Sequence, residues 1–130
     1  MKLYSTLLFL SASRRKVRWG FLTYLYLIAL LLATVLPING SGVLNDSYTL
    51  NIRWDYLLHA LVYIPLPLLM KTLVKNTGKA IFVSLPIAAG LELLQMFIPY
   101  RTFNINDLIA NVAGVMTGCI VMILIKKKFA

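Results

Sequence analysis

The acidic residues of this chain and its only histidine occur at or near the ends of long apolar segments. Asp55 and His59 begin one such segment, Glu92 lies near the end of the next, and Asp107 begins the last, while Asp46 lies in a loop. A charge within hydrocarbon is costly and is retained where it has a partner and a task, so an ionisable residue in a membrane span is a functional candidate. Such groups can bind a ligand, transfer a proton or form an ion pair.

Helical spacing places the polar residues of each segment on one face, because residues three or four positions apart are neighbours on a helix. The stripes are formed by Asp55, His59 and Tyr63, by Glu92 and Gln95, and by Asp107 and Asn111. Arg53 and Arg101 lie in the neighbouring loops, where a guanidinium group can neutralise carboxylates and bind an anion. We therefore predict one polar cluster, formed by Asp55, His59, Tyr63, Glu92, Gln95, Arg101, Asp107 and Asn111.

Each member of this cluster also has a purely structural interpretation. Asp107 could be the N-cap of the last helix, and Asp55 could cap the second. His59 could be a neutral histidine that only makes a hydrogen bond. Glu92 is neither a cap nor near a helix end, so its structural alternative is an ion pair with Arg101, and a buried ion pair is weak evidence for stability.

Small residues and prolines indicate how the segments pack. Gly114 and Gly118, together with Ala110, form a face that allows close contact with another helix, and we expect packing to be their role. The second and third segments are expected to bend at their prolines, which are Pro65, Pro67 and Pro86.

The elements that must position these residues are membrane helices. The chain has 130 residues, of which 60% are hydrophobic and 13% charged. Four apolar runs, at residues 19–36, 54–70, 80–98 and 107–125, are each about 18 residues long, which at ~1.5 Å per residue approaches the hydrocarbon thickness. Helices satisfy their own backbone in lipid, so we predict an all-α, integral membrane four-helix bundle over residues 19–125.

The basic residues predict the orientation of this bundle. Of the 13 lysines and arginines, only Arg53 and Arg101 fall in the loops at 37–53 and 99–106. The others precede the first span, lie between the second and third, or form the basic tail at 126–130. The positive-inside rule therefore places both termini in the cytoplasm and the polar cluster outside. Nucleic acid is not an expected partner, because the net charge of +9 is spread over short stretches beside the membrane.

Residues 1–18 form a basic N-terminal segment, and the first 13 of them resemble a short signal peptide with small residues at its end. Cleavage after residue 13 would leave the basic stretch from Arg14 to Arg18 outside, against the charge rule, so we expect an uncleaved segment, with a short interfacial helix as one form. The single cysteine, Cys119, has no partner for an internal disulfide and is expected to pack in the core. The sequence contains no metal-ligand cluster or phosphate-binding glycine loop, and we expect no cofactor.

The polar pattern resembles the VanZ-like family of small bacterial membrane proteins over about residues 20–125. The resemblance rests on three blocks: Asp55-x-x-x-His59-x-x-x-Tyr63, Glu92-x-x-Gln95-x-x-x-Pro99-x-Arg101, and Asp107-x-x-x-Asn111-x-x-Gly114-x-x-x-Gly118. This resemblance implies a protein of the bacterial cytoplasmic membrane. The founding members of the family look like determinants of resistance to lipoglycopeptide antibiotics such as teicoplanin. The chain departs from the family at Tyr56, where relatives commonly have lysine, and at Asn104, where many have an acid.

Two classes of function follow. In the first, the outward cluster binds an anionic or lipid-linked envelope molecule, with Arg101 and His59 on its phosphate or carboxylate and Glu92 orienting them or acting as a base. Whether such a site catalyses a reaction is left open. In the second, the protein is a small accessory subunit of a larger membrane complex, and the cluster fixes helix packing or contacts a partner. A transporter is a third class, and it would require an oligomer.

Overall fold

The computed structural model describes residues 2–36, 48–49 and 52–128. In chain order its elements are α1 (Lys2–Val35), β1 (Tyr48–Thr49), β2 (Ile52–Arg53), α3 (Trp54–Tyr63), α4 (Pro65–Val74), α5 (Thr77–Leu94), the 3₁₀ helix η1 (Gln95–Phe97) and α6 (Ile105–Lys128). The two strands form a short antiparallel hairpin in which Tyr48 pairs with Arg53. The rest of the described chain consists of helices and the connections between them, so the predicted all-α class is confirmed.

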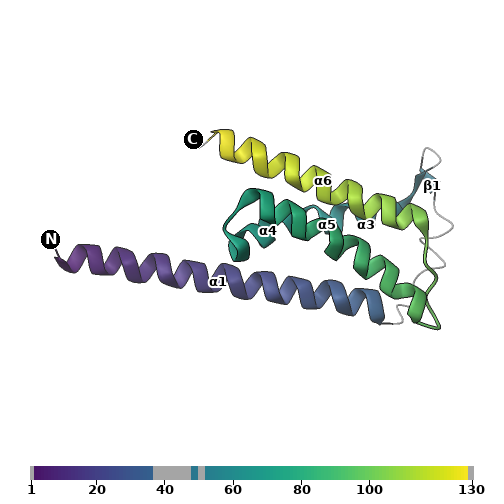
Figure 1. Ribbon diagram of the computed structural model, residues 1–130, viewed down its shortest axis with the longest axis horizontal. Coiled ribbons are helices and arrows are strands. Elements are labelled where there is room, and N and C mark those ends of the chain that lie inside the picture. Colours follow the sequence, from purple (N-terminus) through teal and green to yellow (C-terminus); the bar gives the residue numbers. More distant parts are fainter. Residues whose placement is uncertain (1, 37–47, 50–51, 129–130) are drawn as a thin grey trace.

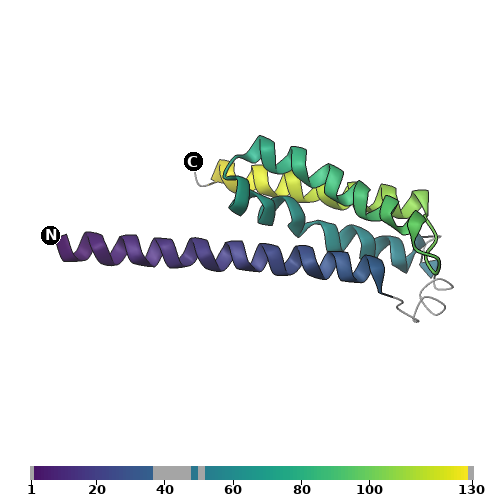
Figure 2. The ribbon, with the colours of Figure 1, turned by 60° about the horizontal axis from the view of Figure 1, so that its bottom comes forward.

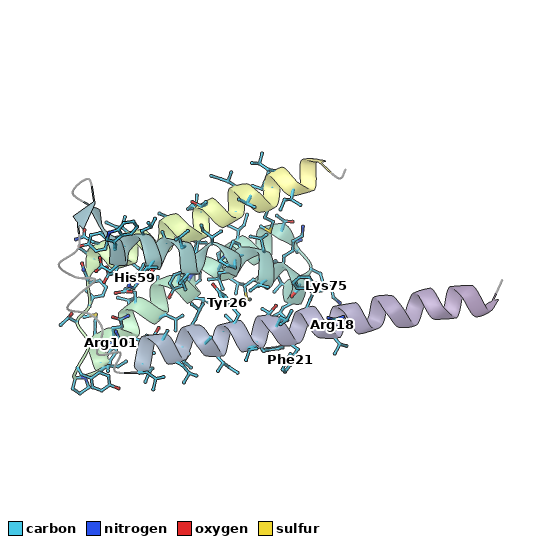
Figure 3. The ribbon with its side chains drawn as sticks, turned by 180° about the vertical axis from the view of Figure 1, so that it is seen from behind. Arg18, Phe21, Tyr26, His59, Lys75 and Arg101 are labelled. Carbon is cyan, nitrogen blue, oxygen red and sulfur yellow. The ribbon has the colours of Figure 1, made fainter. Side chains whose placement is uncertain are left out.

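Four stretches are long and apolar enough to cross a membrane, at Val17–Val35, Trp54–Val74, Thr77–Phe97 and Ile105–Ile125. They match the four predicted spans, and successive spans run in opposite directions in one bundle (Figure 1). Large apolar side chains such as Phe21, Phe82 and Ile123 are exposed, and Phe21 points away from the bundle (Figure 3). An apolar outer surface of this kind is what lipid contact requires, and the protein is a multi-pass membrane protein.

Helix α1 differs from the expected N-terminal arrangement. Instead of a separate interfacial helix followed by a span, residues 2–35 form one helix of 34 residues. At ~1.5 Å per residue such a helix is about 50 Å long, well beyond the hydrocarbon thickness. Its N-terminal part therefore projects past the other helices (Figures 1 and 2).

The second span is interrupted at the first of its prolines. α3 ends at Tyr63 and α4 begins at Pro65, with Ile64 between them. Proline has no backbone N–H and its ring clashes with the preceding turn, so the ladder of helical hydrogen bonds breaks there. The Tyr26 hydroxyl of α1 donates to the Val62 carbonyl oxygen at 2.6 Å, which supplies a donor at the break. In contrast, Pro86 lies inside α5, whose helix continues through it.

Helix α6 lies directly against the backbone of the second span. A Cβ atom built on Gly114 would lie 2.9 Å from the carbonyl carbon of Ala60, and one on Gly118 would lie 2.7 Å from Cγ of Pro67. Real Cβ atoms do not approach other atoms so closely, so only glycine allows this spacing. Cys119, the next residue, is buried in the core, in the packing position expected from the sequence.

The bundle has two chemically different ends. At one end α1 finishes, α3 begins, α5 finishes and α6 begins; we call it the polar end. Arg18 and Lys75 lie toward the opposite, basic end, whereas His59 and Arg101 lie at the polar end (Figure 3). Near the basic end the Thr23 hydroxyl contacts the Leu69 carbonyl at 3.2 Å and the Thr72 hydroxyl at 2.9 Å, which fastens α1 to α4.

Candidate functional site

Three helices are joined at the polar end by a buried chain of polar side chains. Asn111 of α6 lies between the other two members: its Oδ1 is 2.9 Å from Nδ1 of His59 on α3, and its Nδ2 donates to Oε2 of Glu92 on α5 at 2.9 Å. Asn111 is completely buried and Glu92 is 1% exposed. We call these residues the Glu92–Asn111–His59 network.

The close contact between α3 and α6 positions this network. Gly114 is one turn after Asn111, and it packs on the backbone of Ala60, which follows His59 in the chain. With the two backbones this near, a histidine and an asparagine are long enough to meet between the helices. The face assigned to helix packing and the predicted polar cluster are therefore parts of one arrangement.

Glu92 is the most enclosed charged group among the described residues of the cluster. One carboxylate oxygen accepts from Asn111, whereas Oε1 is buried without a hydrogen-bond partner among the residues that the structure describes. His59 and Asp107 lie within electrostatic range, the backbone of Asn104 faces the carboxylate, and Tyr63 is buried close by. A buried carboxylate is costly unless all its oxygens are satisfied, so Glu92 is poorly explained as a contribution to stability.

Arg101 does not form the ion pair with Glu92 that was the structural alternative. Its Nη2 donates to the carbonyl oxygens of Ala33 at 2.8 Å and Leu36 at 2.5 Å. The neighbouring Tyr100 hydroxyl donates to the Val35 carbonyl at 2.7 Å. The last carbonyls of a helix have no partners within it, and cations near a helix C-terminus are favourable, so this connection caps α1.

The helix caps also differ from expectation, because Asn104, not Asp107, caps α6. The Asn104 side-chain oxygen accepts from the backbone N–H of Asn106 at 3.0 Å, and its backbone carbonyl begins the helical hydrogen bonds. Asp107 lies in the first turn, where an acid is favoured by the helix dipole, and it is near Glu92. The structural alternative in which Asp107 is the N-cap of α6 is therefore wrong, and the cap lies three residues earlier.

The remaining predicted residues lie around the network without completing it. Asp55 is half-buried in the first turn of α3, and its Oδ1 accepts from the backbone N–H of Tyr56 at 3.0 Å. Gln95 is buried at the start of η1 and is not hydrogen-bonded to the network in the described part of the chain. The side chain of Arg53 and the whole of Asp46 lie outside what the structure describes.

Several polar contacts were missed by sequence reasoning. Tyr26 of α1 donates from its hydroxyl to a backbone carbonyl of α3, and Tyr100 of the α5–α6 connection donates to a backbone carbonyl of α1. Such contacts leave no periodic signal, because they depend on which carbonyls the neighbouring helix leaves unpaired. The Asn104 cap did have a signal, since an asparagine directly precedes the apolar residue Ile105.

Among the described residues, the polar end contains a buried hydrogen-bond acceptor in Oε1 of Glu92. The Nη2 group of Arg101 at the same end is used by the carbonyls of α1. Nε of Arg101 is buried and has no hydrogen-bond partner within the described ranges. No group of three or more histidine, cysteine or acidic residues suited to a metal ion was found in the described part.

Comparison with known proteins places the chain in a family. The sequence model of VanZ/LLP1 matches residues 4–126. Neither the curated proteins nor the solved structures include a significant match. The matched region contains all four spans and the Glu92–Asn111–His59 network. The protein thus belongs to the VanZ/LLP1 family, as its three polar blocks suggested.

Proposed function

We propose that this protein binds the polar head of a lipid or lipid-linked envelope molecule at its polar end, in the cytoplasmic membrane of a bacterium with both termini in the cytoplasm. The observation that carries the proposal is Glu92, a carboxylate at 1% exposure with one oxygen bound to Asn111 and the other without a partner in the described chain. A group this costly is expected where a ligand uses it.

The chemistry of the polar end supports a ligand that brings hydrogen-bond donors. The carboxylate of Glu92 accepts hydrogen bonds, so hydroxyl or ammonium groups on the headgroup would match it. The anionic ligand expected from Arg101 is less well supported, because its Nη2 donates to Ala33 and Leu36. Its buried Nε–H has no partner among the described residues and remains for an acceptor such as a headgroup phosphate.

Resistance to a lipoglycopeptide such as teicoplanin is part of the proposal. A protein that binds an envelope molecule can change how much of that molecule an antibiotic reaches. Expression in a susceptible bacterium should then raise the inhibitory concentration of teicoplanin, and the variant Glu92→Gln should not. Equal protection by both proteins would contradict a role for Glu92 in resistance.

A second candidate is an accessory subunit of a larger membrane complex. The observation that favours it is α1, whose N-terminal part projects past the other helices and leaves room for a partner along it (Figure 2). In this case purification should recover a stable complex with another membrane protein.

Native mass spectrometry of protein extracted together with its surrounding lipid tests the binding proposal. We expect the wild type to retain an envelope molecule and Glu92→Gln to lose it. The control is Thr117→Val on α6, where the exposed hydroxyl donates to the Ala113 carbonyl of its own helix and to no other described residue. Equal retention by all three proteins would overturn the proposal, and a protein partner without bound lipid would favour the subunit.

A further inference from the structure

The amide of Asn111 is oriented by its hydrogen bond to Glu92, in which the amide nitrogen Nδ2 donates to Oε2 at 2.9 Å. The opposite orientation would place the amide oxygen against Oε2 and lose this hydrogen bond. The amide oxygen, Oδ1, is consequently the atom that faces His59, 2.9 Å from its Nδ1.

This orientation selects the position of the proton on His59. An amide oxygen accepts and cannot donate, so Nδ1 of the imidazole must carry the hydrogen. In a neutral imidazole the other nitrogen, Nε2, then has a free lone pair. In water the opposite tautomer, with the proton on Nε2, is the more populated one, so the network would reverse the ordinary preference.

Nε2 of His59 is available for a ligand. His59 is half-buried at the polar end, and within the described residues its only hydrogen bond is the one from Nδ1 to Asn111. Figure 3 shows the side chain at the end of the bundle where the α5–α6 connection lies. Functional histidines commonly have this arrangement, in which a buried group forms a hydrogen bond with one ring nitrogen and the other nitrogen binds a ligand or transfers a proton.

We infer that Glu92, acting through Asn111, holds His59 as the Nδ1–H tautomer, so that Nε2 accepts a hydrogen bond from a hydroxyl or ammonium group of the bound headgroup. This inference rests on the proposed binding function and gives the ligand group that His59 recognises. Asn111 and Glu92 are positioning residues for His59 in this account.

The tautomer can be measured directly, because His59 is the only histidine of the chain. Protein labelled with ¹⁵N-histidine and reconstituted in lipid gives one pair of ring signals by solid-state NMR. At a pH where the ring is neutral, we expect a protonated Nδ1 and an unprotonated Nε2. A protonated Nε2 with a bare Nδ1 would overturn the inference.

Two variants test whether Glu92 is the cause. Glu92→Gln presents an amide that can either donate or accept, so Asn111 is free to turn over and both tautomers of His59 should appear. The control is Asn106→Ala at the same end, whose side chain donates to the Tyr56 hydroxyl and not to the network; it should keep the wild-type pattern. An unchanged tautomer in Glu92→Gln would contradict the role of Glu92.

Lipids of known headgroup test the ligand chemistry. Phosphatidylethanolamine and phosphatidylcholine carry the same phosphate, but only the first has N–H donors, while phosphatidylglycerol has hydroxyls. In mixed vesicles of the three, the wild type should retain phosphatidylethanolamine or phosphatidylglycerol several-fold over phosphatidylcholine. His59→Asn should lose the preference, because an asparagine nitrogen can replace Nδ1 toward Asn111 but leaves nothing at the position of Nε2.

The two measurements separate the inference from the proposed function. An Nε2–H tautomer refutes the inference even if a headgroup is bound. The other result to consider is an Nδ1–H tautomer together with equal retention of all three lipids by the wild type and by His59→Asn. This result would confirm the tautomer and refute recognition of a donor headgroup.

Discussion

At the scale of single residues, the buried polar groups of this protein have two different tasks. Arg101 and Tyr100 satisfy carbonyls at the end of α1, which any helix end buried near other elements requires. Glu92 does the reverse, since it places a carboxylate in the interior of the bundle, where its burial is costly. The first kind of contact holds the fold together, and the second requires a reason outside folding.

The capping role of Arg101 predicts a loss of stability when the guanidinium is removed. Arg101→Gln should lower the free energy of unfolding by about 2 kcal/mol, because hydrogen bonds from a charged donor are lost, and Tyr100→Phe by about 1 kcal/mol. Lys79→Gln is the control, since it removes the same charge from an exposed side chain at the basic end. Denaturant unfolding in detergent measures all three, and equal stabilities would contradict the capping role.

At the scale of elements, the contact between α6 and the second span determines the geometry of the site. Gly114 and Gly118 lie against the backbone at Ala60 and Ile64, and this spacing lets Asn111 reach His59. The break at Pro65 divides the second span into α3 and α4. A change in the glycine face should therefore affect both the stability of the bundle and the polar network.

This contact predicts a contrast between two glycines. Gly114→Ala should destabilise the protein by about 1–3 kcal/mol, since its methyl group would overlap the Ala60 backbone and separate the helices. Gly90→Ala in α5 meets nothing within 4 Å and should be neutral or stabilising by up to about 1 kcal/mol. Thermal melting of both variants in lipid particles checks this, and similar melting temperatures would argue against the close approach.

The limits of prediction from sequence are also clearest for the elements. The spans could be predicted because hydropathy is a property of each segment alone, and residues at positions 55, 59 and 63 share a face for any helix. The partner of Arg101 could not be predicted, because it depends on where α1 ends relative to the α5–α6 connection. Opposite charge alone favoured Glu92 as the partner of Arg101. In the structure, the guanidinium group instead bonds to the unpaired carbonyls at the end of α1.

At the scale of the whole molecule, charge is divided between the two ends of the bundle. Arg18, Lys71, Lys75 and Lys79 belong to the basic end. The acids Asp55, Glu92 and Asp107 belong to the polar end, together with Arg101, whose guanidinium group caps α1. The positive-inside rule then predicts that the polar end, and the proposed site with it, faces outward.

Single-cysteine labelling tests this orientation. In a Cys119→Ala background, a cysteine at Thr102 in the α5–α6 connection should react with an impermeant maleimide on intact cells, and one at Gly78 should react only after permeabilisation. Both positions are exposed and neither is a helix cap. The reverse pattern would place the polar end in the cytoplasm.

The central claim is that Glu92 is buried for binding and not for stability, and the unfolding free energy of Glu92→Gln in lipid particles tests it most directly. Glutamine keeps the volume and one acceptor for Asn111 while it removes the buried charge, so we predict a protein that is as stable as the wild type or more stable by about 1 kcal/mol. A loss of about 2 kcal/mol or more would contradict the claim and make Glu92 a structural element of the bundle.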